Sequence, residues 1–205
     1  AIQIAAVESP EQNVYLLLDQ AGLPGVYQEL QKHSVPRVAL FEDTTGKSAL
    51  AVAPVLILAA EHGMLIAKKR LYHWLSKYAS DTFSTIFIIS PLPIEAMKIR
   101  LSLRLEAELS EKMSVIFRYY DSRILMALTS IFDEVERAAF FGLGSAWIYP
   151  DRSGQLETIR TVFNLDDKFV APLKLHANQE FAFLEASEID QVLDLLRTVI
   201  PRKMR

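Results

Sequence analysis

The sequence contains no cysteine, which excludes disulfide bonds, thiolate zinc sites and a cysteine nucleophile. It has no excess of positive charge either: the formal net charge is −3, so no nucleic-acid partner is expected. The longest apolar run, residues 49–60, is shorter than the roughly 20 residues of a membrane-spanning helix, and Pro54 interrupts it. The first residues also lack the basic start and apolar centre of a secretory signal. We therefore expect no membrane partner.

What the chain does have is a hydrophobic content of 51% over 205 residues, enough for one domain with a substantial core. Short β-rich apolar runs alternate with stretches of helical periodicity. The predicted strands are 14–19, 37–42, 48–57, 84–90, 103–109, 113–120, 145–151 and 155–163. The predicted helices are 24–33, 64–79, 93–102, 122–132, 133–142 and a last one that starts near Ser187 and stops at Pro201. Residues 164–183 show no regular pattern.

This order predicts an α/β fold: a mixed, mainly parallel central sheet flanked by helices, with an antiparallel hairpin at 103–120 and a C-terminal helical segment. We expect residues 1–150 to form the α/β core. Residues 151–205 would form a C-terminal part that ends in an amphipathic helix and packs on the core.

The stretch FRYYDSRIL, residues 117–125, combines aromatic and charged residues where a predicted strand meets a predicted helix. If strand alternation holds, Phe117 and Tyr119 lie on one face, and Arg118 and Tyr120 lie on the other. Asp121 stands where its carboxylate can cap the helix, and Arg118 and Arg123 are close enough to pair with it or with another acid. This pattern favours a structural brace.

An enzymatic interpretation of the same residues is open. Asp19, Glu42 and Asp121 all lie near the ends of predicted strands, where α/β proteins bind ligands. Together they could hold Mg²⁺ for hydrolysis or phosphoryl transfer, with an arginine binding an anion. However, aspartate is common at caps, and no glycine-rich phosphate loop or nucleophile elbow is present. We therefore expect no catalytic residue, no metal and no cofactor.

FRYYDSRIL resembles the Phe-Arg-Phe/Tyr-Tyr-Asp-Pro-Arg-Val/Leu-Leu signature of the domain-of-unknown-function 4123 family. Other segments are similar to family motifs in the same order: YLLLDQA (15–21), LFEDT (40–44), AVAPVLI (51–57), FIISPL (87–92) and FFGLGSAW (140–147). The resemblance covers residues 14–150, and it implies that the part of the chain after about residue 150 is the more variable one. Departures fall at loop or cap positions: Gln20, Asp43, Ser122 and Ser84–Thr85.

The resemblance implies a cytoplasmic, non-enzymatic adaptor chaperone associated with bacterial type VI secretion. Such adaptors bind the N-terminal region of a cognate toxic effector and help to load it onto the VgrG or PAAR spike, which they contact transiently. By the same resemblance, the motif residues hold the domain together; here they are Asp19, Glu42, Arg118, Asp121 and Arg123.

An adaptor needs an apolar surface that its client covers. Candidate effector-binding residues lie within 168–186, where the pattern is irregular and interrupted by proline: Phe169, Leu173, Leu175, Phe181 and Phe183. The alternative is that these side chains complete the core.

Overall fold

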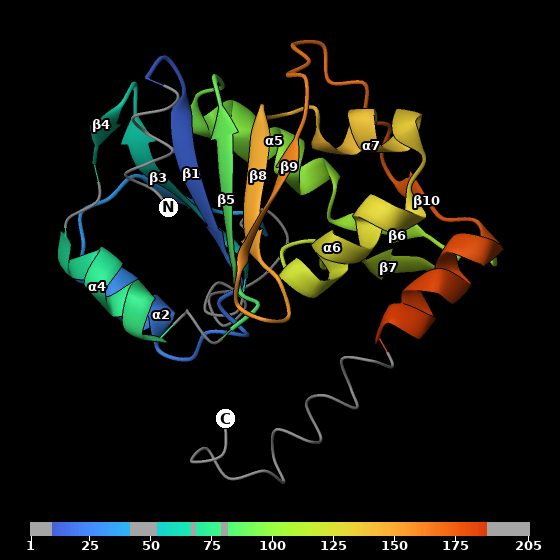
Figure 1. The fold of residues 1–205 in the computed structure, drawn as a ribbon, viewed down its shortest axis with the longest axis horizontal. Coiled ribbons are helices and arrows are strands. Elements are labelled where there is room, and N and C mark those ends of the chain that lie inside the picture. Colours follow the sequence, from blue (N-terminus) through green and yellow to red (C-terminus); the bar gives the residue numbers. More distant parts are fainter. Residues whose placement is uncertain (1–9, 42–52, 67–68, 79–81, 188–205) are drawn as a thin grey trace, which may run out of the picture.

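The computed structural model describes residues 10–41, 53–66, 69–78 and 82–187, and its largest element is a twisted sheet (Figure 1). The strands follow the order β2-β3-β1-β5-β8-β9, and β4 pairs with β3. Their bounds are β1 Asn13–Leu18, β2 Arg37–Ala39, β3 Val55–Glu61, β4 Met64–Leu65, β5 Thr85–Ser90, β8 Ala146–Pro150 and β9 Leu156–Arg160.

The α/β class is confirmed, but the prediction of a mainly parallel sheet is wrong, because every strand pair of this sheet is antiparallel. The prediction failed because β1, β3 and β5 are buried on both faces. Their sequences therefore lack the alternation of apolar and polar residues that is typical of antiparallel strands. The helices between strands also favoured a parallel prediction, although a connecting helix does not by itself fix the direction of the next strand.

Two helical layers cover the sheet, one on each face (Figure 1). On one face, Tyr15 and Leu17 of β1 belong to the larger core, which includes buried residues of α5 (Ile94–Leu103), α6 (Ser122–Ile131) and α7 (Glu134–Phe141). On the other face, Leu16 and Leu18 belong to a second core with α2 (Val26–Gln31) and α4 (Lys69–Tyr78). Within the described residues, no helix is long and apolar enough to span a membrane.

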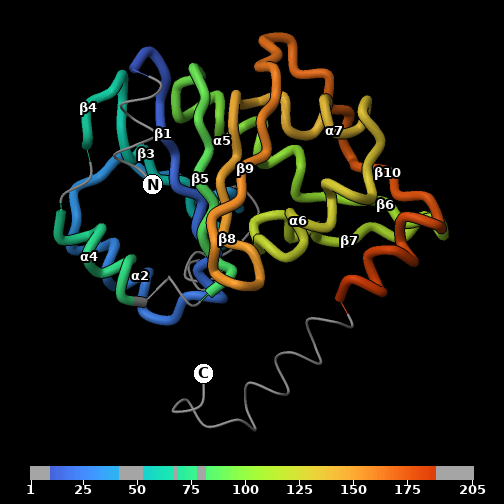
Figure 2. The backbone as a smooth tube through the Cα atoms, in the orientation of Figure 1, coloured from blue at the N-terminus to red at the C-terminus, as the bar shows by residue number. Residues whose placement is uncertain are grey.

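A small second sheet lies beside the larger core, with the strand order β10-β6-β7. The predicted hairpin is present: β6 (Glu106–Glu108) and β7 (Ser114–Ile116) are antiparallel. After β9 the chain passes α7 and reaches β10 (Leu173–Lys174), which pairs parallel to β6 (Figure 2). Residues 177–187 then form a helix. Neither β10 nor this helix was predicted.

Several element bounds also differ from the predictions. The strand predicted at 113–120 ends at Ile116, and the strand predicted at 48–57 is found at Val55–Glu61, beyond Pro54. The helix predicted at 64–79 begins at Lys69, because β4 folds back on β3 through His62 and Gly63, which both have positive φ. The last predicted helix, beyond Ser187, lies outside the described residues.

Arg104 is a fully buried charged residue at the end of α5. Its guanidinium donates to three backbone carbonyls, those of Arg100 at 2.7 Å, Ala139 at 2.9 Å and Phe140 at 2.8 Å. It also makes a bidentate pair with Asp167, at 2.7 and 3.1 Å. Burial alone would raise the pKa of Asp167, but the bonds from Arg104 outweigh it and lower that pKa below its usual value. The pair therefore ties α5, α7 and the loop before β10 together.

Replacing Asp167 with Asn should lower the free energy of unfolding by about 3 kcal/mol, because Arg104 would stay buried without a counter-charge. Asn is the suitable replacement, since residue 167 has a positive φ that Asn tolerates. Because the folded-state pKa of Asp167 is depressed, its contribution is complete above the unfolded-state pKa of about 4 and is lost as the pH falls below it.

Chemical denaturation at neutral and acidic pH measures this effect. The matched control is Asp166→Asn, since the exposed Asp166 carboxylate lies 3.9 Å from the Nζ atom of exposed Lys168. This replacement should change the free energy of unfolding by less than about 0.5 kcal/mol. Equal stabilities of the two variants at neutral pH would contradict the assignment.

Candidate functional site

Asp19 follows β1 directly and is buried at the end of the sheet. Its N–H donates to the Ser84 carbonyl at 2.9 Å, and its carboxylate accepts from the Ala21 N–H at 3.1 Å and from Arg118 at 2.7 Å. The Arg118 side chain is half-exposed, and its guanidinium lies 5.7 Å from the ring centre of Tyr120. Burial lowers the pKa of Arg118, but Asp19 outweighs it and the pKa is raised. Arg118 therefore stays charged.

Asp121 is the N-cap of α6, so the predicted cap is present. Its carboxylate accepts from the Arg123 N–H at 3.0 Å and from the Arg123 guanidinium at 3.0 and 2.7 Å. That guanidinium lies 5.0 Å from the ring centre of Phe83. The Ser122 N–H donates to the Phe83 carbonyl at 2.9 Å, which joins the start of α6 to the residues before β5.

The burial of residues 117–119 agrees with the predicted side-chain alternation, but the prediction fails at Tyr120, because β7 ends at Ile116 and the chain turns. Phe117, Tyr119 and Tyr120 are all buried, and only Arg118 reaches solvent. Tyr119 donates its hydroxyl to the Leu101 carbonyl at 2.8 Å, and burial raises its pKa. In FRYYDSRIL, three buried aromatic residues therefore surround the exposed Arg118 in sequence.

The three strand-end acids have different positions. Asp19 and Asp121 each accept hydrogen bonds from an arginine and from a backbone N–H, whereas Glu42 lies outside the described residues. In the part of the chain that the structure describes, no group of three or more His, Cys, Asp or Glu side chains could hold a metal ion. The two aspartates therefore have a structural role: their hydrogen bonds hold the end of β1, the start of β5 and the start of α6 together.

The candidate effector-binding residues divide between core and surface. Leu173 and Leu175 are buried in the larger core. Phe169 is partly buried, with its ring centre 4.4 Å from the Arg104 guanidinium, and Phe183 packs edge-on against Phe117 with ring centres 5.7 Å apart. Phe181 differs from these four, because 62% of its surface is exposed.

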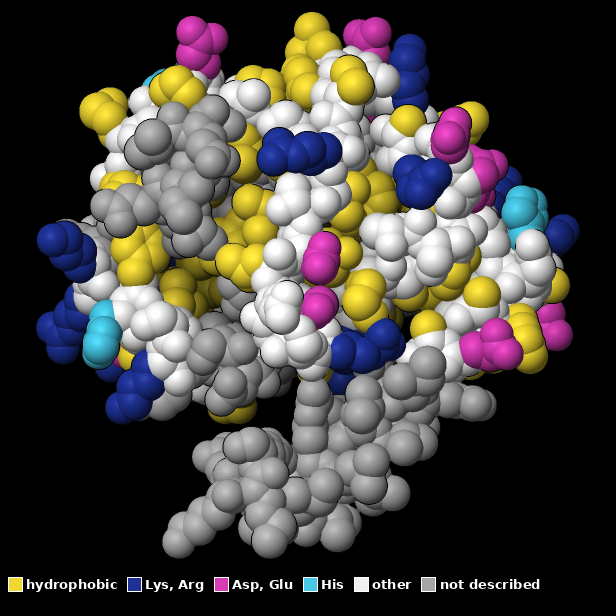
Figure 3. All heavy atoms as spheres, viewed as in Figure 1, with side chains coloured by type: hydrophobic (Ala, Val, Ile, Leu, Met, Phe, Trp, Pro, Cys, Tyr) yellow, Lys and Arg dark blue, Asp and Glu magenta, His cyan; other side chains and the backbone are white. Residues whose placement is uncertain are grey.

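Phe181 belongs to an apolar stripe on the outer side of the helix of residues 177–187. Ala177, Phe181 and Leu184 have the spacing i, i+4, i+7 and are all exposed, and Leu184 is 64% exposed. We call these three residues the outer stripe. The opposite side of the helix packs inward through Phe183 and through Gln179, whose amide donates to Glu136 of α7 at 2.9 Å. Figure 3 shows hydrophobic side chains over this helix at the lower right.

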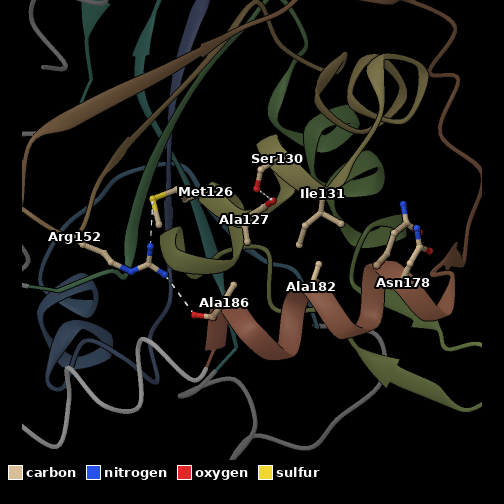
Figure 4. A pocket seen from close by; sticks show the side chains of 9 residues that line it. Met126, Ala127, Ser130, Ile131, Arg152, Asn178, Ala182 and Ala186 are labelled. Atoms are coloured by element: carbon tan, nitrogen blue, oxygen red, sulfur yellow. Dashed lines mark hydrogen bonds between the residues drawn. The ribbon is translucent and has the colours of Figure 1, made fainter.

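Open space flanks the helix of residues 177–187 on two sides. A groove of about 380 Å³ separates it from α6, and Arg152 points across one end toward the Ala186 carbonyl (Figure 4). A second, more apolar groove of about 240 Å³ is lined by Leu109, Ile124, Phe183 and Leu184 among others. The sequence did not reveal Leu184 as a candidate, although its spacing from Phe181 was a readable signal.

Comparison with known proteins gives one match. The family model described as Domain of unknown function (DUF4123) matches residues 14–139, which is more than half of the chain. No curated protein and no solved structure matches the chain. The matched region contains FRYYDSRIL and the Asp19–Arg118 pair, whereas the outer stripe lies beyond it.

Replacing Arg118 with Ala should lower the free energy of unfolding by about 1.5 kcal/mol, because buried Asp19 would lose its charged hydrogen-bond partner. The half-exposed position of Arg118 makes the loss smaller than for a fully buried pair. In an Asp19→Asn background the same change should cost about 1 kcal/mol less. Denaturant unfolding of the wild type, both single variants and the double variant measures this coupling, and strictly additive effects would contradict it.

Proposed function

Because the chain belongs to the DUF4123 family, we propose that it is a non-enzymatic cytoplasmic adaptor for type VI secretion. It binds the N-terminal region of a cognate toxic effector and helps to load that effector onto the VgrG or PAAR spike, which it contacts transiently. The resemblance of FRYYDSRIL and the other motifs supports this role.

The observation that carries the proposal is the outer stripe. A helix with apolar residues on two opposite sides is typical of a helix that is covered on both sides, and here Phe183 faces the core while Phe181 and Leu184 face solvent. Covering a large apolar side chain is worth about 1.5–3 kcal/mol. Phe181 and Leu184 are therefore suitable anchors for a client polypeptide.

The position of the outer stripe also fits selective binding. The family match ends at residue 139, within α7, so the helix of residues 177–187 is not part of the matched scaffold. A surface outside the shared scaffold can differ between adaptors without disturbing the ion pairs that brace the fold. The two flanking grooves give side chains of the client further places to enter.

The test is co-expression of this chain with the N-terminal regions of type VI effectors encoded near it, followed by affinity measurement on the purified complex. Replacing Phe181 and Leu184 together with Ser should weaken binding by at least about tenfold, because two covered apolar side chains are lost. The melting temperature should change little, since both side chains are exposed.

The matched control replaces Met64 and Ile99 with Ser, because these residues are comparably exposed, at 70% and 63%, but lie on β4 and α5. This control should bind as the wild type does. A wild-type chain that captures none of the neighbouring effectors would refute the adaptor role, and equal weakening by both pairs would refute the assigned surface.

A further inference from the structure

The outer edge of β9 is an exposed strand edge. β9 is the last strand in the order of the large sheet, and β8 is its only partner among the described residues. Four of its five residues, including Leu156, Thr158 and Arg160, are exposed. An edge of this kind presents a row of backbone N–H and C=O groups that another strand can pair with.

The hydrogen bonds to β8 show which groups form that row. The Thr161 N–H donates to the Ser145 carbonyl at 3.0 Å, and the Gln155 carbonyl accepts from the Asp151 N–H at 2.8 Å. Since bonded positions alternate along an antiparallel pair, the odd-numbered residues 155–161 face β8. The N–H and C=O groups of Leu156, Thr158 and Arg160 consequently point away from the sheet, and no described residue hydrogen-bonds to them.

The common obstacles to strand addition are absent from β9 itself. The strand contains no proline, and its register with β8 runs from Leu156 to Arg160 without a shift, so no bulge turns the edge away. Its two charged residues, Glu157 and Arg160, have opposite signs, so β9 has no net charge that would repel an approaching strand.

A groove of about 470 Å³ runs between β9 and α7. Ala138, Ile159 and Val162 are among its apolar lining residues, and Val162 is 88% exposed. Glu134, Arg137 and Arg160 are its charged lining residues. The two arginines exceed the single glutamate, so the groove favours a segment that places apolar residues inside it and an acidic residue at its rim.

We propose that an extended segment from the effector's N-terminal region adds to β9 as a further strand. Its backbone pairs with Leu156, Thr158 and Arg160, and its alternate side chains enter the groove beside α7. This inference rests on the adaptor role, but it assigns a second surface and specifies the conformation of the bound client.

Replacing Thr158 with Pro tests the strand addition. Proline removes the central outward N–H but no bond to β8, because the Thr158 N–H points away from that strand, and proline is tolerated on edge strands. Thr158→Val is the matched control, since valine keeps the N–H and the β-branched shape. With the co-purified effector fragment, Thr158→Pro should weaken binding by at least about tenfold and Thr158→Val should bind as the wild type does.

Residue-specific amide exchange provides a readout that does not depend on the proline variant. In the free wild-type protein, the amides of Thr158 and Arg160 should exchange fast and those of Glu157 and Ile159 slowly. In the complex, the amides of Thr158 and Arg160 should become protected.

The outcomes separate the two proposals. Equal affinity of all three proteins, or unchanged exchange at Thr158 and Arg160 in the complex, would overturn strand addition and leave the adaptor role standing. A wild-type chain that binds no effector fragment would overturn both. A wild-type dimer that Thr158→Pro converts to monomer would also overturn the inference, because a second copy would then occupy the edge.

Discussion

The buried guanidinium of Arg104 is the interaction on which the arrangement of the C-terminal half depends. A buried charge must be paired and hydrogen-bonded, and Arg104 meets this need with carbonyls of α5 and α7 and with Asp167. Asp167 stands in the loop that leads to β10 and then to the helix of residues 177–187. One side chain thus fixes the position of the loop that precedes β10.

Two further arginine–aspartate pairs involve the residues that follow β7. Arg118 joins β7 to Asp19 after β1, and Arg123 joins α6 to its own N-cap. Such pairs contribute little net stability when formed, but the loss of one partner is costly, so their main effect is to fix geometry. This explains why the motif FRYYDSRIL combines charge with buried aromatic residues.

Part of this architecture could be predicted from the sequence. The strands β1 and β5, the helix α6, the β6–β7 hairpin and the Asp121 cap each have a local signal of spacing or capping. Strand direction could not be predicted, since burial on both faces removes the alternation that distinguishes antiparallel strands. Arg104 was missed because its partners are distant in the sequence. The helix of residues 177–187 was missed because it begins within residues 164–183, which show no regular apolar pattern.

α7 lies between the two surfaces that we propose for the client. On one side Glu136 accepts hydrogen bonds from Gln179 of the helix that carries the outer stripe, and on the other side Ala138 lines the groove beside β9. A client that contacts both surfaces therefore spans α7, and its second contact forms at a high effective concentration once the first is made. Two modest contacts, one through apolar side chains and one through backbone hydrogen bonds, can then give firm binding. Neither of these proposed contacts requires a large apolar patch on the free protein.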